Sequence, residues 1–325
     1  MAQPVINPDT PLPSDPETSP PDEVGVTDKA AQKAAKKRRR KRAAGNAAKA
    51  VSSPWASLVA IIIALLWTLP TLGLFVTSFR TARDINETGW WHAFVKPWFT
   101  MKNYEQAMFG SSTSLIDYFV NSLVITIPAV MIPMLLATIA AYAFAWIKFP
   151  GRDILFVMVF ALQVVPLQVA LIPLLQFFNR TSIDGFWRVW LAHGTFALPL
   201  AVFLLHNFMK DLPGELLEAA RVDGAGHVQI FTRIMLPLLT PAIASFGIFQ
   251  FLWVWNDLLV ALIFLGGTRD VAPLTVRVAE LSGTLGSSWH LLAAGAFISM
   301  IVPVVVFLAL QRYFVRGLLA GGLKG

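Results

Sequence analysis

Six long apolar runs alternate with shorter polar segments along most of the chain. They cover residues 55–79, 116–146, 153–178, 188–209, 240–265 and 290–311. A helix of about 20 apolar residues crosses the roughly 30 Å hydrocarbon core of a bilayer. The pattern therefore predicts an all-α integral membrane protein with six transmembrane helices.

The most polar internal stretch, residues 218–237, separates the fourth and fifth apolar runs. Its charged and amide side chains stand between flanks that carry almost no charge, and they are Glu218, Arg221, Asp223, Gln229 and Arg233. Such a segment cannot lie in hydrocarbon, so it must lie in water or against a protein. Its pattern predicts a short helix over 216–222, a glycine-rich break, and a second helical run that ends at Pro237.

Two glycines, Gly224 and Gly226, mark the predicted break. Glycine tolerates a positive φ and a close backbone approach, so we expect both to serve a sharp turn. Asp223 suits the same turn because its short side chain can cap nearby N–H groups. The small side chains of Ala219 and Ala220 would allow the short helix to press closely into a groove on another protein.

The composition agrees with a membrane protein. Hydrophobic residues make up 56% of the 325 positions and charged residues only 14%, whereas a soluble domain averages about 25% charged. The chain has no Cys, which excludes disulfides and thiolate metal sites. The net charge of +7 is local, because ten of the 26 Lys and Arg residues lie within residues 29–49.

The first 50 residues are predicted to be a disordered extension, acidic and then basic. Residues 1–28 are rich in Pro, Ser, Thr and acid, and cannot bury enough apolar surface to fold. The basic run could be a solvated topology signal, a helix on anionic lipid, or a nucleic-acid contact. We favour the topology signal and expect no nucleic-acid partner. Residues 51–325 then form the transmembrane domain.

The Lys and Arg count predicts the orientation. With the N-terminus in the cytoplasm, the inside segments carry 18 of these residues and the outside loops carry 8, as the positive-inside rule requires. The basic N-terminal run decides the balance. A cleaved signal peptide is a weaker interpretation of the first run, because no small-residue cleavage site follows it. Six spans then place the segment at 211–237 and the tail at 312–325 in the cytoplasm.

The polar segment has a specific spacing: Glu218-Ala219-Ala220, three residues, Gly224, nine residues, then Ile234-x-Leu236-Pro237. This spacing resembles the cytoplasmic coupling loop of permease subunits in binding-protein-dependent ABC importers. The stretch FLWVWND at 251–257 and the ending QRYFVRGLLAGGLKG at 311–325 resemble the carbohydrate-uptake branch. Within it they resemble the smaller permease of maltose and α-glucoside importers. The resemblance covers most of the chain beyond residue 50, but not the N-terminal extension.

The resemblance implies a cell-membrane permease that works with other proteins. Its expected partners are a second, larger permease subunit, an ATPase dimer, an extracytoplasmic sugar-binding protein and the lipid bilayer. The residues implied to couple to the ATPase are Glu218, Ala219, Ala220, Asp223, Gly224, Ala225 and Gly226. The tail residues Leu323, Lys324 and Gly325 are also implied to reach the ATPase dimer.

The translocation path has five candidate residues. Asp257 is the clearest acid within a span, roughly 24 Å along a helix that starts at Pro241, and a charge there usually faces a bundle interior or water. Trp253, Trp255 and Asn256 beside it offer stacking faces and an amide, which suit a sugar. Asn121 lies near the start of the second span. The alternative is that these side chains only hold helices together, and in the family most sugar contacts come from the other permease.

Motifs for catalysis or nucleotide binding do not occur in the sequence. It contains no G-x-x-x-x-G-K-[ST] motif, and a G-x-G-x-x-G pattern that begins at Gly224 fails because its sixth position is Gln229. The five His show no metal-ligand spacing, and none has a second candidate ligand nearby in sequence. We therefore expect no catalytic residue, cofactor or metal, and assign ATP hydrolysis to a separate subunit.

Three alternatives remain open at this point. The same machine could import another solute, such as glycerol phosphate or a polyamine. An ion-coupled secondary transporter would instead show charged pairs or internal repeats, and only one clear acid is evident. A membrane enzyme would require a catalytic constellation that the sequence does not contain.

Overall fold

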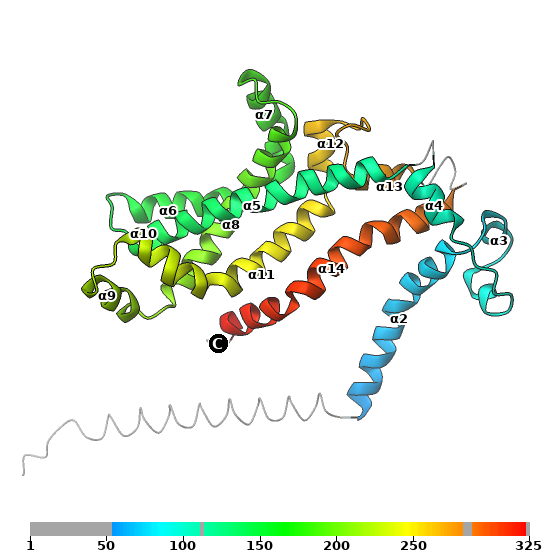
Figure 1. The fold of residues 1–325 in the computed structure, drawn as a ribbon, viewed down its shortest axis with the longest axis horizontal. Helices are drawn as coiled ribbons and strands as arrows, with labels where there is room; N and C mark the ends of the chain where they lie inside the picture. The colour runs from blue at the N-terminus through cyan, green and yellow to red at the C-terminus, as the bar shows by residue number, and fades with distance from the viewer. Residues whose placement is uncertain (1–53, 111–113, 282–287, 323–325) are drawn as a thin grey trace, which may run out of the picture. The chain divides into compact units, whose positions relative to one another are not determined.

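The computed structural model describes residues 54–110, 114–281 and 288–322, and the regular structure in these ranges is helical (Figure 1). The chain divides into two compact units, residues 1–70 and 71–325. The predicted disordered extension, residues 1–50, lies outside the described residues. The described part of the first unit is the beginning of helix α2 (Pro54–Ser78).

Five helical stretches in the described part are long and apolar enough to cross a membrane. They are α2, α5 (Ile116–Trp146), α8 (Phe186–Lys210), the run His227–Trp255, and α14 (Trp289–Gly322). A sixth crossing is present if the two bent segments Arg152–Val164 and Leu167–Arg180 are counted together as one span. The helices agree with the predicted all-α architecture, although two of the predicted spans differ in form.

The third span, predicted as one helix over 153–178, is broken. Helix α6 (Arg152–Ala161) with the short 3₁₀ turn η2 (Leu162–Val164) meets α7 (Leu167–Arg180) at a bend of 107°. Val165, between them, is extended with φ −69° and ψ 118°. The cause is Pro166, because a proline disfavours the helical region for the residue that precedes it.

The fifth span, predicted over 240–265, is also different, and the helix does not end at Pro237. Helix α10 (His227–Ile230), a one-turn π-helix η3 (Phe231–Met235) and α11 (Leu236–Trp255) form one continuous run. The N–H of Leu236 bonds the carbonyl of Phe231, five residues back. This change of register directly precedes Pro237, which has no N–H to donate, so the proline is accommodated within the helix.

Shorter helices connect or follow the long ones. They are α3 (Ala82–Glu87), η1 (Trp90–Phe94), α4 (Lys102–Phe109), α9 (Glu215–Val222), α12 (Leu259–Leu265) and α13 (Leu274–Glu280). Helix α12 follows α11 after a break at residues 256–258, so the predicted fifth span stops near Trp255. In Figure 1, α9 lies at the end of the bundle, beyond α10.

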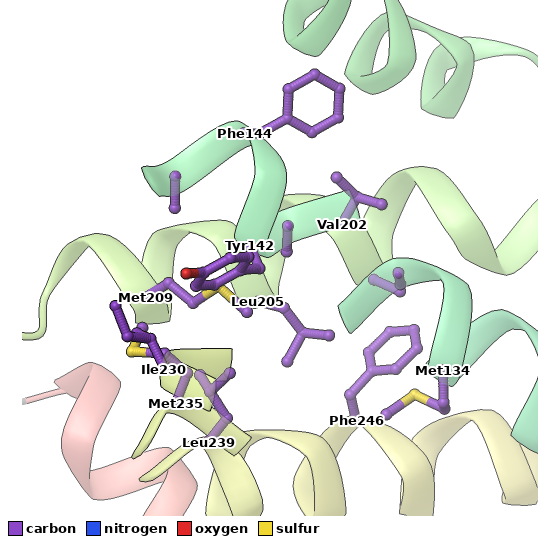
Figure 2. Packing of buried hydrophobic residues seen from close by; sticks show 14 of the residues in the cluster. Met134, Tyr142, Phe144, Val202, Leu205, Met209, Ile230, Met235, Leu239 and Phe246 are labelled. Carbon is purple, nitrogen blue, oxygen red and sulfur yellow. The ribbon is translucent and has the colours of Figure 1, made fainter. Parts of the chain in front are cut away.

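A large apolar cluster joins α5, α8, α9, α10, η3 and α11, and we call it the Tyr142 cluster. Its buried members are Met134, Ala137, Ala141, Tyr142, Phe144, Ala145, Ala201, Val202, Leu205, Met209, Leu217, Ala220, Ile230, Met235, Leu239 and Phe246. Figure 2 shows Tyr142 among Met209, Leu205 and Ile230. The cluster therefore packs the predicted coupling segment directly onto two of the spans.

At the end of the spans away from the Tyr142 cluster, buried polar side chains hydrogen-bond loops and short helices to the long helices. The amide of Asn103, only 3% exposed, donates to the carbonyls of Ser78 and Arg80, both at 2.8 Å. The hydroxyl of Ser122 accepts a bond of 2.7 Å from the N–H of Leu274. These contacts satisfy backbone groups at the end of α2 and the start of α13, where no intrahelical partner exists.

Replacing Asn103 with Ala should destabilise the protein, because two buried carbonyls lose their donors. The expected loss is about 1–3 kcal/mol, seen as a lower Tm for the detergent-purified protein. Lys102→Ala, at the exposed neighbouring position, is the matched control and should leave Tm unchanged. Equal Tm values for both variants and wild type would show that the Asn103 contacts do not stabilise the fold.

Candidate functional site

The segment 211–237 folds as a short helix, a tight turn and the start of the long helical run. Leu217 and Ala220 of α9 are 2% and 8% exposed and belong to the Tyr142 cluster. The opposite face of α9 carries Glu215, Glu218, Ala219 and Val222, all exposed. At about 100° per residue, these four positions share one side of the helix. We call this side the outer face of α9.

The turn after α9 is a Schellman motif. The N–H of Gly224 bonds the carbonyl of Arg221 at 3.0 Å, and the N–H of Ala225 bonds the carbonyl of Ala220 at 2.9 Å. Gly224 has φ +80°, and a Cβ added there would meet no atom within 4 Å. Glycine is therefore required for its conformation and not for lack of space. This explains physically why a glycine stands four residues after Ala220.

Three sequence expectations about this turn are wrong. Gly226 has φ −76°, and a Cβ added there would contact nothing within 4 Å, so neither a positive φ nor a close approach requires it. Ala220 faces the chain's own core, so only Ala219 of the two alanines is exposed. Within the described residues, the turn closes through backbone groups, and Gly226 N–H is capped by Gln229 Oε1 at 3.1 Å. The Asp223 side chain does not provide that cap.

A cavity of about 660 Å³ lies beside the bend between α6 and α7, against α8 and α11. Its lining residues are Leu162, Gln163, Val164, Val165, Pro166, Leu167, Ala170, Thr195, Phe196, Ala197, Pro199, Leu200, Phe246, Phe249, Gln250 and Trp253. The wall is mostly apolar, and its polar side chains are Gln163, Thr195, Gln250 and the indole of Trp253. Of the five predicted path residues, Trp253 is the one that lines this cavity.

Asp257 is not within a helix, as the sequence suggested, but in the break between α11 and α12. Its two carboxylate oxygens accept bonds from the N–H groups of Val260 at 3.1 Å and Ala261 at 2.8 Å. Its carbonyl accepts from the Thr275 hydroxyl at 2.6 Å. Asp257 therefore stabilises the break between α11 and α12. This favours a role in holding helices together over a role in the translocation path.

His193 of α8 lies against Asp257 and is a neighbour that the sequence did not reveal. Its Nε2 is 3.5 Å from Asp257 Oδ2, and its ring meets Trp253 edge to face with centroids 5.1 Å apart. The imidazole is fully buried. No residue near His193 in the sequence indicated this contact. The two residues are 64 positions apart in the sequence, so no local pattern could have indicated the pair.

The other predicted path residues make structural contacts. Trp255 is 3% exposed and donates its indole N–H to Ser299 O at 3.0 Å, while Asn256 donates to Leu252 O at 2.8 Å. Asn121 donates to the carbonyls of Arg269 and Ala272, at 2.9 and 3.1 Å. Asn121 lines a second, smaller cavity with Arg269, apart from Trp253. The five candidates thus do not converge on one site.

Two further expectations concern the C-terminal tail residues and metal binding. The tail residues 323–325 lie outside the described residues, although the backbone of α14 continues to Gly322. In the part of the chain that the structure describes, no group of three or more His, Cys, Asp or Glu side chains is placed to hold a metal ion.

Comparison with known proteins gives a consistent result. A family model described as "Binding-protein-dependent transport system inner membrane component" matches residues 129–319. An osmoprotective compounds uptake permease protein of Synechocystis sp. is 55% identical over 81% of this chain and 89% of its own length. An alpha-glucoside transport system permease protein of Rhizobium meliloti is 52% identical over 72% of this chain and 62% of its own length.

The fold also resembles a solved structure. A chain of a bacterial ABC transporter involved in the import of the acidic polysaccharide alginate superposes with a TM-score of 0.67 at 18% identity. The match covers 80% of this chain and 95% of that one. At this identity the likeness concerns the fold alone.

Gly224→Ala should loosen the end of α9, because an alanine at φ +80° costs about 1–2 kcal/mol. We expect faster hydrogen–deuterium exchange of the backbone N–H groups over residues 219–225, with α8 unchanged. Gly224→Asn is the matched variant, since asparagine enters this conformation more readily, and it should restore part of the protection. Exchange equal to wild type in the alanine variant would contradict the Schellman explanation.

Proposed function

The chain belongs to the family of binding-protein-dependent transport system inner membrane components, and from that premise we propose its cargo and its route of coupling to ATP. It is a multi-pass membrane permease subunit of an ATP-driven sugar importer and not an enzyme. The cargo that we propose is a neutral α-glucoside. This proposal draws on the alpha-glucoside permease relative and on a melibiose/raffinose/stachyose import permease of Bacillus subtilis, 32% identical over 86% of this chain.

The lining of the larger cavity supports a neutral cargo. None of the described residues that line it is Asp, Glu, Lys, Arg or His. A phosphate ester or a polyamine would cross such a wall without a compensating charge, which is costly in a low-dielectric site. Trp253 offers a face for a sugar ring, Gln163 offers an amide, and the Thr195 hydroxyl, which donates to Leu191 O at 2.8 Å, can still accept a hydrogen bond. This argues against glycerol phosphate and polyamines as cargo, and family membership removes the ion-coupled transporter.

The proposed partners are a second permease subunit, two ATPase subunits and an extracytoplasmic sugar-binding protein. In the proposed orientation both termini and α9 lie in the cytoplasm. The observation that carries the coupling role is the outer face of α9, exposed on a helix whose other face is packed into the Tyr142 cluster. A partner that binds this face would move α9 together with the helices that α9 packs against, which are α5, α8 and α11.

The mechanism is rigid-body alternating access. When ATP closes the ATPase dimer, α9 follows the cleft that holds it, and α8 and the run His227–Trp255 swing with it. The two helix breaks, at Pro166 and at residues 256–258, border the moving segments and allow α7 and α12 to change direction. The cavity beside Trp253 then opens to one side of the membrane and closes to the other.

Ala219→Trp should prevent docking of α9, because a large side chain on the outer face cannot enter a closely packed cleft. Overpacking costs about 1–3 kcal/mol, so the amount of ATPase that co-purifies from mild detergent should fall roughly tenfold. Ala219→Ser keeps a small side chain and should retain the ATPase. If both variants and wild type bind the ATPase equally, α9 is not the coupling surface.

Trp253→Ala should reduce uptake of radiolabelled maltose into proteoliposomes that hold the whole transporter. Loss of an aromatic face costs about 0.5–1.5 kcal/mol, or roughly two- to tenfold in rate. Trp187→Ala, at an exposed position of α8 outside the cavity lining, is the control. Spermidine or glycerol phosphate uptake by wild type, without maltose uptake, would overturn the sugar proposal.

A further inference from the structure

A tyrosine near the end of α5 is hydrogen-bonded to the first residue of α10. The Tyr142 hydroxyl lies 3.0 Å from His227 Nδ1, and a longer contact of 3.5 Å reaches the His227 carbonyl. The two residues are 85 positions apart. The contact therefore links a transmembrane helix to the segment that directly follows the Gly224 turn.

The ring of Tyr142 packs among apolar side chains, whereas its hydroxyl contacts a polar side chain. The residue is 5% exposed within the Tyr142 cluster, and its ring meets Phe231 edge to face with centroids 5.2 Å apart. The hydroxyl leaves this apolar setting and meets His227, which is exposed. Removal of the hydroxyl alone therefore keeps the packing and deletes one directional contact.

Chain connectivity makes this contact informative. Helix α9 is covalently continuous with α8 on one side and with α10 on the other. Helix α5 has no such connection to α9, so it must follow α9 through side-chain contacts. Apolar packing resists separation of two surfaces but is non-directional, whereas a hydrogen bond requires a particular distance and angle.

We propose that the Tyr142–His227 hydrogen bond positions α5 on the coupling segment. When α9 moves, α5 then moves with it, and the distance between α5 and the segment stays the same. The inference rests on the proposed coupling of α9 to an ATPase and adds Tyr142 and His227 as positioning residues. Helix α5 also packs extensively against α8, which is covalently continuous with α9, so the hydrogen bond adds a directional contact to this packing. Without the bond, α10 shifts against α5, and ATP turnover moves the segment without moving α5 equally.

The natural absence of cysteine permits a direct distance measurement. Spin labels at Ile139→Cys on α5 and Thr232→Cys on η3, both exposed, report the α5–η3 distance in the complete transporter. The measurement is made by electron–electron double resonance without nucleotide and after vanadate trapping with ATP. In the wild-type background we expect the same distance in both states, and with Tyr142→Phe a nucleotide-dependent shift or broadening.

Three further single variants and one double variant separate positioning from general damage. Tyr118→Phe makes the same change at the other end of α5 and should behave as wild type. His227→Ala should reproduce the effect of Tyr142→Phe, and the double variant should add nothing further. His227→Asn supplies an acceptor near the place of Nδ1 and should restore the constant distance. The ATP hydrolysed per maltose imported should rise about two- to tenfold in Tyr142→Phe, the factor that one neutral hydrogen bond carries.

The outcomes distinguish the two proposals. If wild type retains no ATPase, the proposed function fails, and this inference fails with it. If wild type retains the ATPase but its α5–η3 distance changes between the two states, α5 does not follow the segment and the inference alone is overturned. An unchanged distance and unchanged ATP consumption in Tyr142→Phe also overturn it.

Discussion

Satisfaction of backbone hydrogen bonds is the constraint on which this structure depends. At membrane depth, each N–H group that leaves a helix needs a partner within the protein, because hydrocarbon offers none. The break after α11 meets this need with Asp257, whose carboxylate accepts from Val260 and Ala261. The break at Pro166 has one donor fewer to satisfy. Both breaks are thereby stable places at which a span changes direction, and the larger cavity lies beside the one at Pro166.

The segment 211–237, whose coupling role we propose, is held in place for a related reason. Its short helix is too brief to be stable in isolation, yet it is closed by the Gly224 Schellman motif and anchored by Leu217 and Ala220 in the Tyr142 cluster. These contacts leave the outer face of α9 free while they fix the helix on its spans. A mechanical element requires both properties, since a loose helix would absorb the movement of a partner instead of passing it on.

Hydropathy alone predicted the all-α fold and the apolar helices of five of the six expected crossings, because apolar length is a property of contiguous sequence. The turn at Gly224 was also predictable, since its conformation depends on one residue and its neighbours. A local effect of the proline explains the bend at Pro166. The continuation of the helix through Pro237 and the place of Asp257 in a break were not predicted. Each depends on partners distant in sequence or on a register change that composition does not record. The pairs His193–Asp257 and Tyr142–His227 belong to the same class.

The π-helix turn at Phe231–Met235 has a geometrical consequence for the whole segment. Such a turn holds one residue more than an α-helical turn, and each residue of a regular helix turns by about 100°. The direction in which α9 and its turn face is therefore offset, relative to α11, from that of an uninterrupted α-helix. Deletion of one residue within Phe231–Met235 would therefore change the direction in which the outer face of α9 points relative to α11, while the sequences of α8, α9 and α11 stay the same.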